Sequence, residues 1–89
     1  MPRLVFTPNL QRHVGCPEDD LPGATLHELL EHYFASHPRA RGYLLDEHGA
    51  VRKHMLVFVD GRPARDRAAL TDALGPDSEV FVFQALSGG

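Results

Sequence analysis

The sequence ends in two glycines, and a glycine carboxylate is a group that can react inside a narrow site. Gly88 and Gly89 follow a strand-like run at residues 79–84, with no further element between them. Glycine makes up about 7% of average sequence, so a terminal pair arises by chance in roughly one chain in two hundred. No side chain stands beside this carboxylate, so a partner can approach it without steric hindrance. The pattern predicts a functional tail, and the alternative is a frayed terminus without a role.

The composition predicts one small domain to carry this tail. The chain has 89 residues, of which 43% are hydrophobic and 24% charged, and its net charge is −3. These values are ordinary for a globular protein. No stripe of lysine and arginine is present, so nucleic acid is not expected as a partner.

Cysteine usage and hydropathy predict a cytoplasmic protein. Cys16 is the only cysteine, which excludes an intrachain disulfide and indicates a reducing compartment. The longest apolar run, residues 55–59, is too short to span a membrane. The N-terminus lacks the hydrophobic core of a signal peptide, so no membrane association is expected.

The sequence predicts one helix together with the residues at which it begins and ends. Thr25-Leu26-His27-Glu28 spells a capping box, with Thr25 at the N-cap and Glu28 reaching back to it. Pro38 disfavours helix at the preceding residue and ends the helix at His37. Apolar residues follow the spacing of a helix packed on one face, at Leu26, Leu29, Leu30, Tyr33 and Phe34.

Short strands are predicted on both sides of this helix. Residues 4–8 begin a strand, and residues 10–16 are expected to return as its hairpin partner before a loop at 17–23. Residues 42–45, 55–59 and 79–84 are expected as further strands, with residues 68–74 a helical turn or an irregular connection. Asp60-Gly61 favours a type I′ hairpin turn. The order predicts an α+β fold, in which one main helix packs across a mixed sheet of four to five strands.

This arrangement, with its diglycine end, resembles the β-grasp fold of ubiquitin-like proteins, and most closely the MoaD/ThiS family of sulfur carriers. The resemblance covers most of the chain and is strongest from Leu45 onward, in residues 45–49, 52–54, 57–62 and 79–89. The longer MoaD-type members usually carry Asn-Gly at Asp60-Gly61, Asp-Gly-Asp-Glu at Pro76-Asp77-Ser78-Glu79, and proline at Gln84. The resemblance implies a β-grasp domain over residues 1–84 and a flexible diglycine tail over residues 85–89.

The resemblance also implies the chemistry of the tail. In this family a ThiF/MoeB-type adenylating enzyme uses ATP and magnesium to convert the terminal carboxylate into an acyl-adenylate. A persulfide donor then supplies sulfur, and a downstream synthase uses the resulting thiocarboxylate. Gly89 and Gly88 are the implied adenylation and thiocarboxylate site, and the chain is a carrier that binds no cofactor, not an enzyme.

Two other functions fit the same sequence. A protein modifier would share the acyl-adenylate and then form isopeptide bonds to lysines of other proteins. A β-grasp binding module would carry the two glycines incidentally.

The last strand predicts where a partner docks. If residues 79–84 alternate in a half-buried strand, Val80 and Val82 face the helix, while Phe81 and Phe83 face the other side. With Leu86, these rings form an expected docking surface beside the tail, which the resemblance assigns to the adenylating enzyme. The alternative is that both faces of the sheet are covered, or that a rim loop shields the rings. Four arginines are candidates for a charged rim: Arg52, Arg62, Arg65 and Arg67.

We expect no further site from the other side chains that could bind a metal or react. His27-Glu28-Leu29-Leu30-Glu31-His32 resembles the H-E-x-x-H zinc motif, but its second histidine comes one residue too late, so these polar residues are expected in solvent and no metal site is predicted. Cys16 is expected as a small packed residue, with redox or persulfide chemistry as the alternative. No G-x-x-x-x-G-K-[ST] motif occurs, so the partner must bind the ATP.

Overall fold

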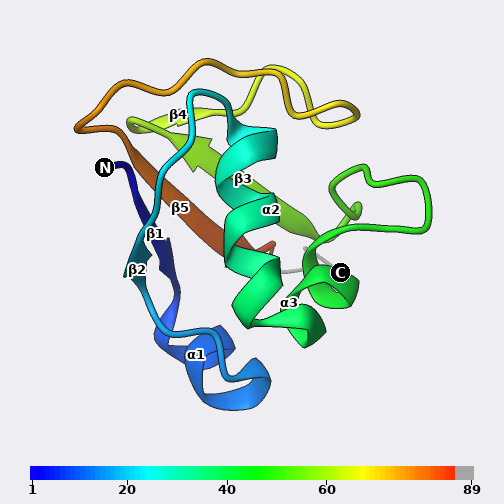
Figure 1. Ribbon diagram of the computed structural model, residues 1–89. Helices are drawn as coiled ribbons and strands as arrows, with labels where there is room; N and C mark the ends of the chain where they lie inside the picture. Colours follow the sequence, from blue (N-terminus) through cyan, green and yellow to red (C-terminus); the bar gives the residue numbers. More distant parts are fainter. Residues whose placement is uncertain (86–89) are drawn as a thin grey trace.

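The computed structural model describes residues 1–85 and shows a five-stranded mixed sheet with its longest helix across one face (Figure 1). The elements in chain order are β1 (Arg3–Phe6), α1 (Pro8–Val14), β2 (Asp19–Asp20), α2 (Leu26–Ser36), α3 (Pro38–Leu44), β3 (Met55–Val59), β4 (Arg62–Pro63) and β5 (Glu79–Gln84). The strand order in space is β2-β1-β5-β3-β4. Strands β1 and β5 run parallel, and the other pairs are antiparallel. The predicted α+β, β-grasp architecture is confirmed.

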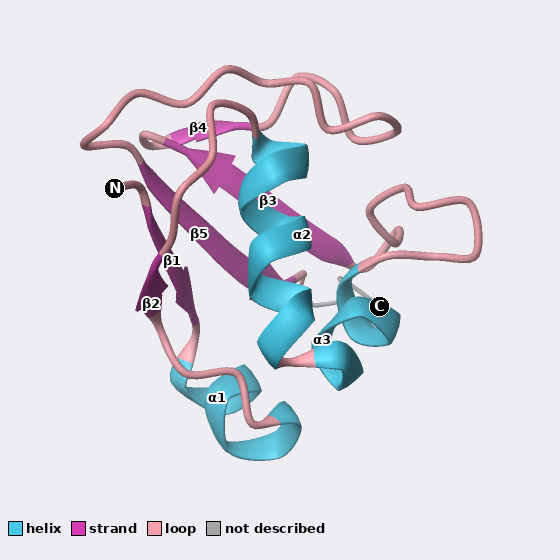
Figure 2. Ribbon diagram, viewed as in Figure 1, coloured by secondary structure: helices cyan, strands magenta, loops and turns pink. Residues whose placement is uncertain are grey.

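Helix α2 begins and ends as predicted. The Thr25 hydroxyl accepts a hydrogen bond from the Glu28 backbone N–H at 3.2 Å. The Glu28 carboxylate reaches back one residue further than expected, to the N–H of Ala24 at 3.4 Å. All five residues of the predicted apolar stripe are buried against the sheet. Figure 2 shows α2 crossing in front of the long strands β3 and β5.

Residues 10–16 were expected as a strand, and this prediction is wrong. Residues from Pro8 form α1 instead, and Pro8 at the start of the helix has a fixed φ that suits it. Leu10 and Val14 are four residues apart and turn to the same side, where Leu10 is buried. Gly15 then ends the helix in the left-handed region, at φ 68°. The hairpin partner of β1 is the two-residue β2, inside the segment expected as a loop.

Residues 42–45 were also wrongly predicted as a strand. They end α3, which starts at Pro38 directly after α2. Ala40 and Leu44 face the core at helical spacing, whereas Tyr43 is 54% exposed. Leu44 and Leu45 are both buried, which a flat strand with one solvent face does not allow. Helical backbone up to Leu44, followed by extended Leu45, produces this pattern.

The hairpin that joins β3 to β4 has the predicted turn. Its first turn residue, Asp60, also hydrogen-bonds to the start of β5. Asp60 and Gly61 have φ of 51° and 82°, as a type I′ turn requires. The Asp60 carboxylate accepts one hydrogen bond from the Ser78 hydroxyl and one from the Glu79 N–H, both at 2.9 Å. The Asp60 N–H donates to the Glu79 carbonyl. This contact fixes where β5 begins.

Residues 64–74 form an irregular connection in which the carboxylates of Asp66 and Asp72 accept hydrogen bonds from backbone N–H groups. Asp66 accepts hydrogen bonds from the Thr71 hydroxyl at 2.6 Å and from the N–H groups of Ala68 and Ala69. These donors, the Thr71 hydroxyl first, lower the pKa of Asp66 to about 2. Leu70, with φ of 59°, fills the core beneath this loop.

The low pKa of Asp66 predicts how stability changes in acid. A carboxyl group with a lowered pKa stabilises the fold above its unfolded-state value, near 4, and this contribution disappears as pH falls through about 2. Asp66→Asn should therefore lower the free energy of unfolding at pH 5, and the difference from wild type should shrink toward pH 2. Urea unfolding between pH 2 and 5 measures it. Asp77→Asn, at an exposed carboxylate, is the control, and a constant difference for Asp66→Asn across this range would contradict the assignment.

Candidate functional site

The tail leaves the domain from its central strand. Strand β5 lies between β1 and β3, so both of its edges are hydrogen-bonded. At its last residue, Gln84 is opposite Met55 of β3, and the next N–H, of Ala85, donates to the His54 carbonyl at 2.7 Å. The chain is thus held up to Ala85. Leu86, Gly88 and Gly89, which the sequence identified, lie outside the described residues.

The two faces of β5 differ as the alternation predicted. Val80 and Val82 are fully buried on the side of α2. Phe81, on the other side, is 36% exposed, and Phe83 is half-buried. The prediction of the strand faces is therefore confirmed. Whether the two rings dock a partner remains a prediction.

Sequence reasoning missed a third aromatic residue on this face. Phe58 of β3 is the cross-strand neighbour of Phe81, and its ring centroid lies 5.1 Å from that of Phe83. The rings of Phe81 and Phe83 are 5.6 Å apart. The residues that β1 and β3 place beside these rings are apolar too. We call the whole set the open-face patch: Val5, Leu56, Phe58, Phe81 and Phe83.

The signal for Phe58 was available in the sequence. In residues 55–59, Met55 and Val57 alternate with Leu56 and Phe58, and the structure buries the first pair and leaves the second half-buried. Applying the period-two rule to this run as well as to residues 79–84 would have found Phe58. The patch therefore spans three strands, since Val5 of β1 also belongs to it, and is wider than the sequence indicated.

Two of the four arginines that were candidates for the charged rim donate hydrogen bonds to backbone carbonyls instead. Arg52 donates from Nε to the Gly42 carbonyl at 2.8 Å. Arg67 donates from Nη2 to the carbonyls of Arg52 and Met55, both at 2.7 Å. These bonds tie α3 and the loop after β4 to the start of β3. The guanidinium groups of Arg52 and Arg67 are thus engaged in hydrogen bonds that stabilise the fold.

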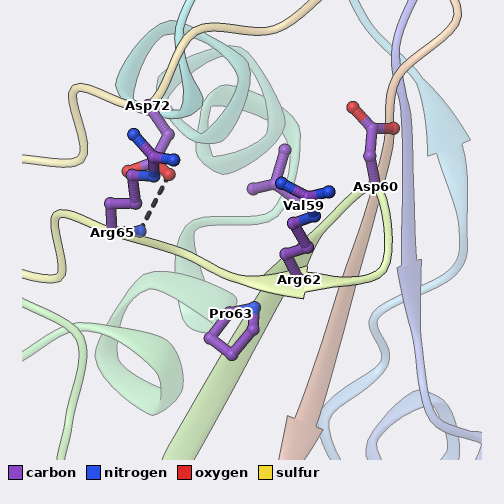
Figure 3. A pocket seen from close by; sticks show the side chains of 6 residues that line it. All are labelled: Val59, Asp60, Arg62, Pro63, Arg65 and Asp72. Carbon is purple, nitrogen blue, oxygen red and sulfur yellow. Dashed lines mark hydrogen bonds between the residues drawn. The ribbon is translucent and has the colours of Figure 1, made fainter.

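The other two arginines line a cavity at the far end of the sheet. Arg62 and Arg65 surround about 360 Å³ together with Val59, Asp60, Pro63 and Asp72 (Figure 3). The Asp72 carboxylate accepts hydrogen bonds from the N–H groups of Arg65, the dashed line in Figure 3, and of Asp66. Two arginines and two aspartates give the lining no net charge. Val59 is opposite Val80, so this cavity lies at the end of β5 away from Ala85.

The remaining candidates have structural environments. His27, Glu28, Glu31 and His32 are all exposed, as expected for a solvated helix face. Among the residues described, no group of three or more histidine, cysteine, aspartate and glutamate side chains could hold a metal ion. Cys16 is 2% exposed, and burial raises the pKa of its thiol. A buried thiol with a raised pKa is a poor nucleophile, so the packed-residue interpretation fits. No helix in residues 1–85 is long and apolar enough to cross a membrane.

Comparison with solved structures shows the same fold. One chain of the Amycolatopsis orientalis BexX/CysO complex superposes with a TM-score of 0.83 over 100% of both chains, at 19% identity. CysO of Mycobacterium tuberculosis gives 0.81 over 97% of this chain and 100% of that chain, at 18% identity. Small archaeal modifier protein 1 from Methanosarcina acetivorans gives 0.79 over 99% and 95%, also at 18% identity.

Comparison of the sequence identifies the family. No curated protein matched. The family model described as the ThiS family matches residues 10–89, which include β5, the four patch residues on β3 and β5, and both terminal glycines. Because this match covers nearly the whole chain, the protein belongs to the ThiS family of ubiquitin-like sulfur carriers.

Proposed function

We propose that this chain carries sulfur as a thiocarboxylate on Gly89. The observation that carries the proposal is the family match, which covers residues 10–89 and so includes β5 and Gly88-Gly89. A ThiF/MoeB-type enzyme would bind ATP and magnesium and adenylate the Gly89 carboxylate. A persulfide donor would then supply the sulfur, and a downstream synthase would consume the thiocarboxylate. The chain itself acts as co-substrate and carrier, not as an enzyme.

The adenylation step is needed because a carboxylate is a poor acyl donor. An α-carboxyl group titrates near 3.5, so it is ionised at neutral pH and repels nucleophiles. Forming a bond from its oxygen to the α-phosphate of ATP releases pyrophosphate and makes AMP the leaving group. The outer sulfur of a persulfide can then displace AMP at the same carbon, and a thiol that cleaves the resulting acyl disulfide supplies the two electrons that release the thiocarboxylate. The two glycines offer only backbone to the partner's site, so the reacting carbon is open to attack from either side.

The folded domain supplies the surface that a partner binds in order to position this carbon. Two glycines and a serine carry little information, so specificity must come from the folded surface. The open-face patch is the apolar surface nearest the root of the tail, since Phe83 precedes Ala85 by two residues. Clustered aromatic rings that are half-buried before association are typical interface anchors. We assign this patch, with Leu86, to docking of the adenylating enzyme.

A second function, protein modification, is favoured by one comparison. The Methanosarcina acetivorans structure is that of a small archaeal modifier protein, and its fold matches over 99% of this chain. A modifier would use the same acyl-adenylate and pass the Gly89 acyl group to a lysine amine of another protein. Conjugates that yield peptides with Gly-Gly on lysine, and that disappear when Gly89 is deleted, would establish this function.

The sulfur-carrier proposal predicts a defined change in mass. Incubation with the adenylating enzyme, ATP, magnesium, a persulfide donor and a reducing thiol should replace one oxygen atom by sulfur, and fragmentation should place the change at Gly89. Intact mass beforehand establishes that the purified chain ends at this residue. Deleting Gly89, or changing Gly88→Val, should abolish the exchange because the carboxylate no longer fits the site. The thermal midpoint should stay unchanged, since both residues lie beyond the last strand. Thiolation of the truncated chain would overturn the proposal.

The docking assignment predicts that one substitution weakens binding to the adenylating enzyme and that a different one lowers folding stability. Truncating a central aromatic anchor costs on the order of 2 kcal/mol, so Phe83→Ala should weaken binding to the adenylating enzyme about 30-fold. Leu30→Ala, in the core beneath α2, should instead cost about 2–5 kcal/mol of folding stability. Tyr43→Ala removes an exposed ring on α3 and is the matched control for binding.

Titration calorimetry and thermal melting of each variant separate the two effects. If Phe83→Ala binds like wild type while Leu30→Ala melts early, the docking surface lies elsewhere. If Phe83→Ala melts like Leu30→Ala, its ring supports the core, and its effect on binding carries no information about docking.

A further inference from the structure

Two arginines at the cavity beside the β3–β4 hairpin form no side-chain ion pair or hydrogen bond within the described chain. Among residues 1–85, such contacts of arginine side chains belong to four others: Arg3, Arg41, Arg52 and Arg67. Figure 3 shows Arg62 and Arg65 on the same side of the segment that joins them, at the cavity of about 360 Å³. A guanidinium is always charged and carries only donors. The cavity therefore presents two cationic groups whose N–H donors have no acceptor in residues 1–85.

One carboxylate of this cavity can still accept hydrogen bonds. Asp72 is half-buried, and its two oxygens accept the N–H groups of Arg65 at 2.8 Å and of Asp66 at 2.9 Å. A carboxylate oxygen has two lone pairs, so each of these oxygens can accept one more hydrogen bond. No ion pair joins Asp72 to a basic side chain within residues 1–85. Asp72 is therefore an acceptor that backbone hydrogen bonds hold in place.

A second cavity, of about 390 Å³, shares Arg65 and Asp72 with the first. Its remaining lining comes from Asp66, Thr71 and Ala73. The Asp66 carboxylate accepts hydrogen bonds from the Thr71 hydroxyl and from three backbone N–H groups of its own loop. These donors fill its acceptor sites, so Asp66 contributes charge to the cavity and no free acceptor. Asp72, with its spare lone pairs, faces both cavities.

The charge of the two linings limits the class of ligand. Two arginines and three aspartates, which are Asp60, Asp66 and Asp72, give the cavities together a net charge of −1. A dianion such as phosphate would enter a region that is already negative, and a simple cation would meet two unpaired guanidinium groups. A molecule with both a carboxylate and an ammonium group has no net charge. Its two groups suit the arginine donors and the Asp72 acceptor.

Size and an apolar neighbour narrow the class further. A cavity of about 360 Å³ lies at the lower end of the range of ligand sites, so it suits a small molecule. Val59 is opposite Arg62 in the sheet, so both side chains lie on the same side of the hairpin (Figure 3). An apolar group of the ligand can therefore contact Val59 while a carboxylate reaches Arg62. A carboxylate, an ammonium group and an apolar side chain on one carbon atom describe an α-amino acid.

We propose that this cavity binds a free α-amino acid with an apolar side chain. The ligand carboxylate accepts hydrogen bonds from the guanidinium groups of Arg62 and Arg65, its ammonium group donates to Asp72, and its side chain covers Val59. Val59 alternates with Phe58 of the open-face patch, so the ligand lies on the other side of β3. The patch and Ala85 stay uncovered, and binding is compatible with a partner on the open face.

The test titrates the isotope-labelled full chain with L-leucine and follows it by nuclear magnetic resonance. Leucine should shift the Nε–H signals of Arg62 and Arg65 and the backbone N–H signals of Arg65 and Asp66, which donate to Asp72. An open site and a small ligand predict a dissociation constant in the millimolar range. Isocaproate lacks the ammonium group of leucine, and isoamylamine lacks its carboxylate. Each should bind about tenfold more weakly, because a charge-assisted hydrogen bond is lost.

Glutamine variants of the two arginines test the assignment of residues. Arg62→Gln and Arg65→Gln should each weaken leucine binding about tenfold, and the double variant should abolish it. Arg39→Gln removes another exposed arginine, on α3, and is the matched control that should bind like wild type. Because all three side chains are exposed, the melting curves of these variants should match that of wild type.

Three results would overturn the inference. They are the absence of a saturable shift with leucine, unchanged leucine binding in the double variant, and binding of isocaproate, isoamylamine or inorganic phosphate as tightly as leucine. In the last case the cavity would be a site for simple ions. None of these results bears on thiolation of the tail, so the sulfur-carrier proposal is tested separately.

Discussion

The fold depends on one strand that is hydrogen-bonded on both sides. Strand β5 pairs with β1 in parallel and with β3 antiparallel, so it is the axis of the sheet although it is last in sequence. Its two valines are fully buried under α2. Removing β5 would leave two separate pairs, β2-β1 and β3-β4, neither of which is a stable sheet by itself. The tail is therefore attached to the element that the domain is least able to move.

The beginning of this strand is set by Asp60 and Ser78, which hydrogen-bond to each other although 18 residues separate them in sequence. In this structure the Asp60 carboxylate accepts the Ser78 hydroxyl and the Glu79 N–H. A carboxylate with two oxygens suits two donors, and a serine can donate where an aspartate cannot. The two residues thus fix the start of β5 together.

How much the sequence could predict follows from the range of the interactions involved. Helix α2 was predicted because its cap and apolar stripe are local and agree with each other. Helices α1 and α3 were missed because seven residues give barely two turns, and Leu10 with Val14, or Ala40 with Leu44, supplies only one apolar repeat. Pro8 and Pro38 were the available signals, since proline is favoured at the first helical position. The breadth of the open-face patch could not follow from β5 alone, because Phe58 joins it through a pairing between distant segments.

The two outermost strands have a consequence for how the molecule behaves at high concentration. Strands β2 and β4 contain only two residues each, Asp19–Asp20 and Arg62–Pro63. Short edges that carry charge, or a proline without an N–H group, cannot template a strand from a neighbouring molecule. The molecule thereby avoids the edge-to-edge stacking that begins many aggregates. Its unprotected surface is the flat face of the sheet, where association depends on matching side chains and not on backbone pairing.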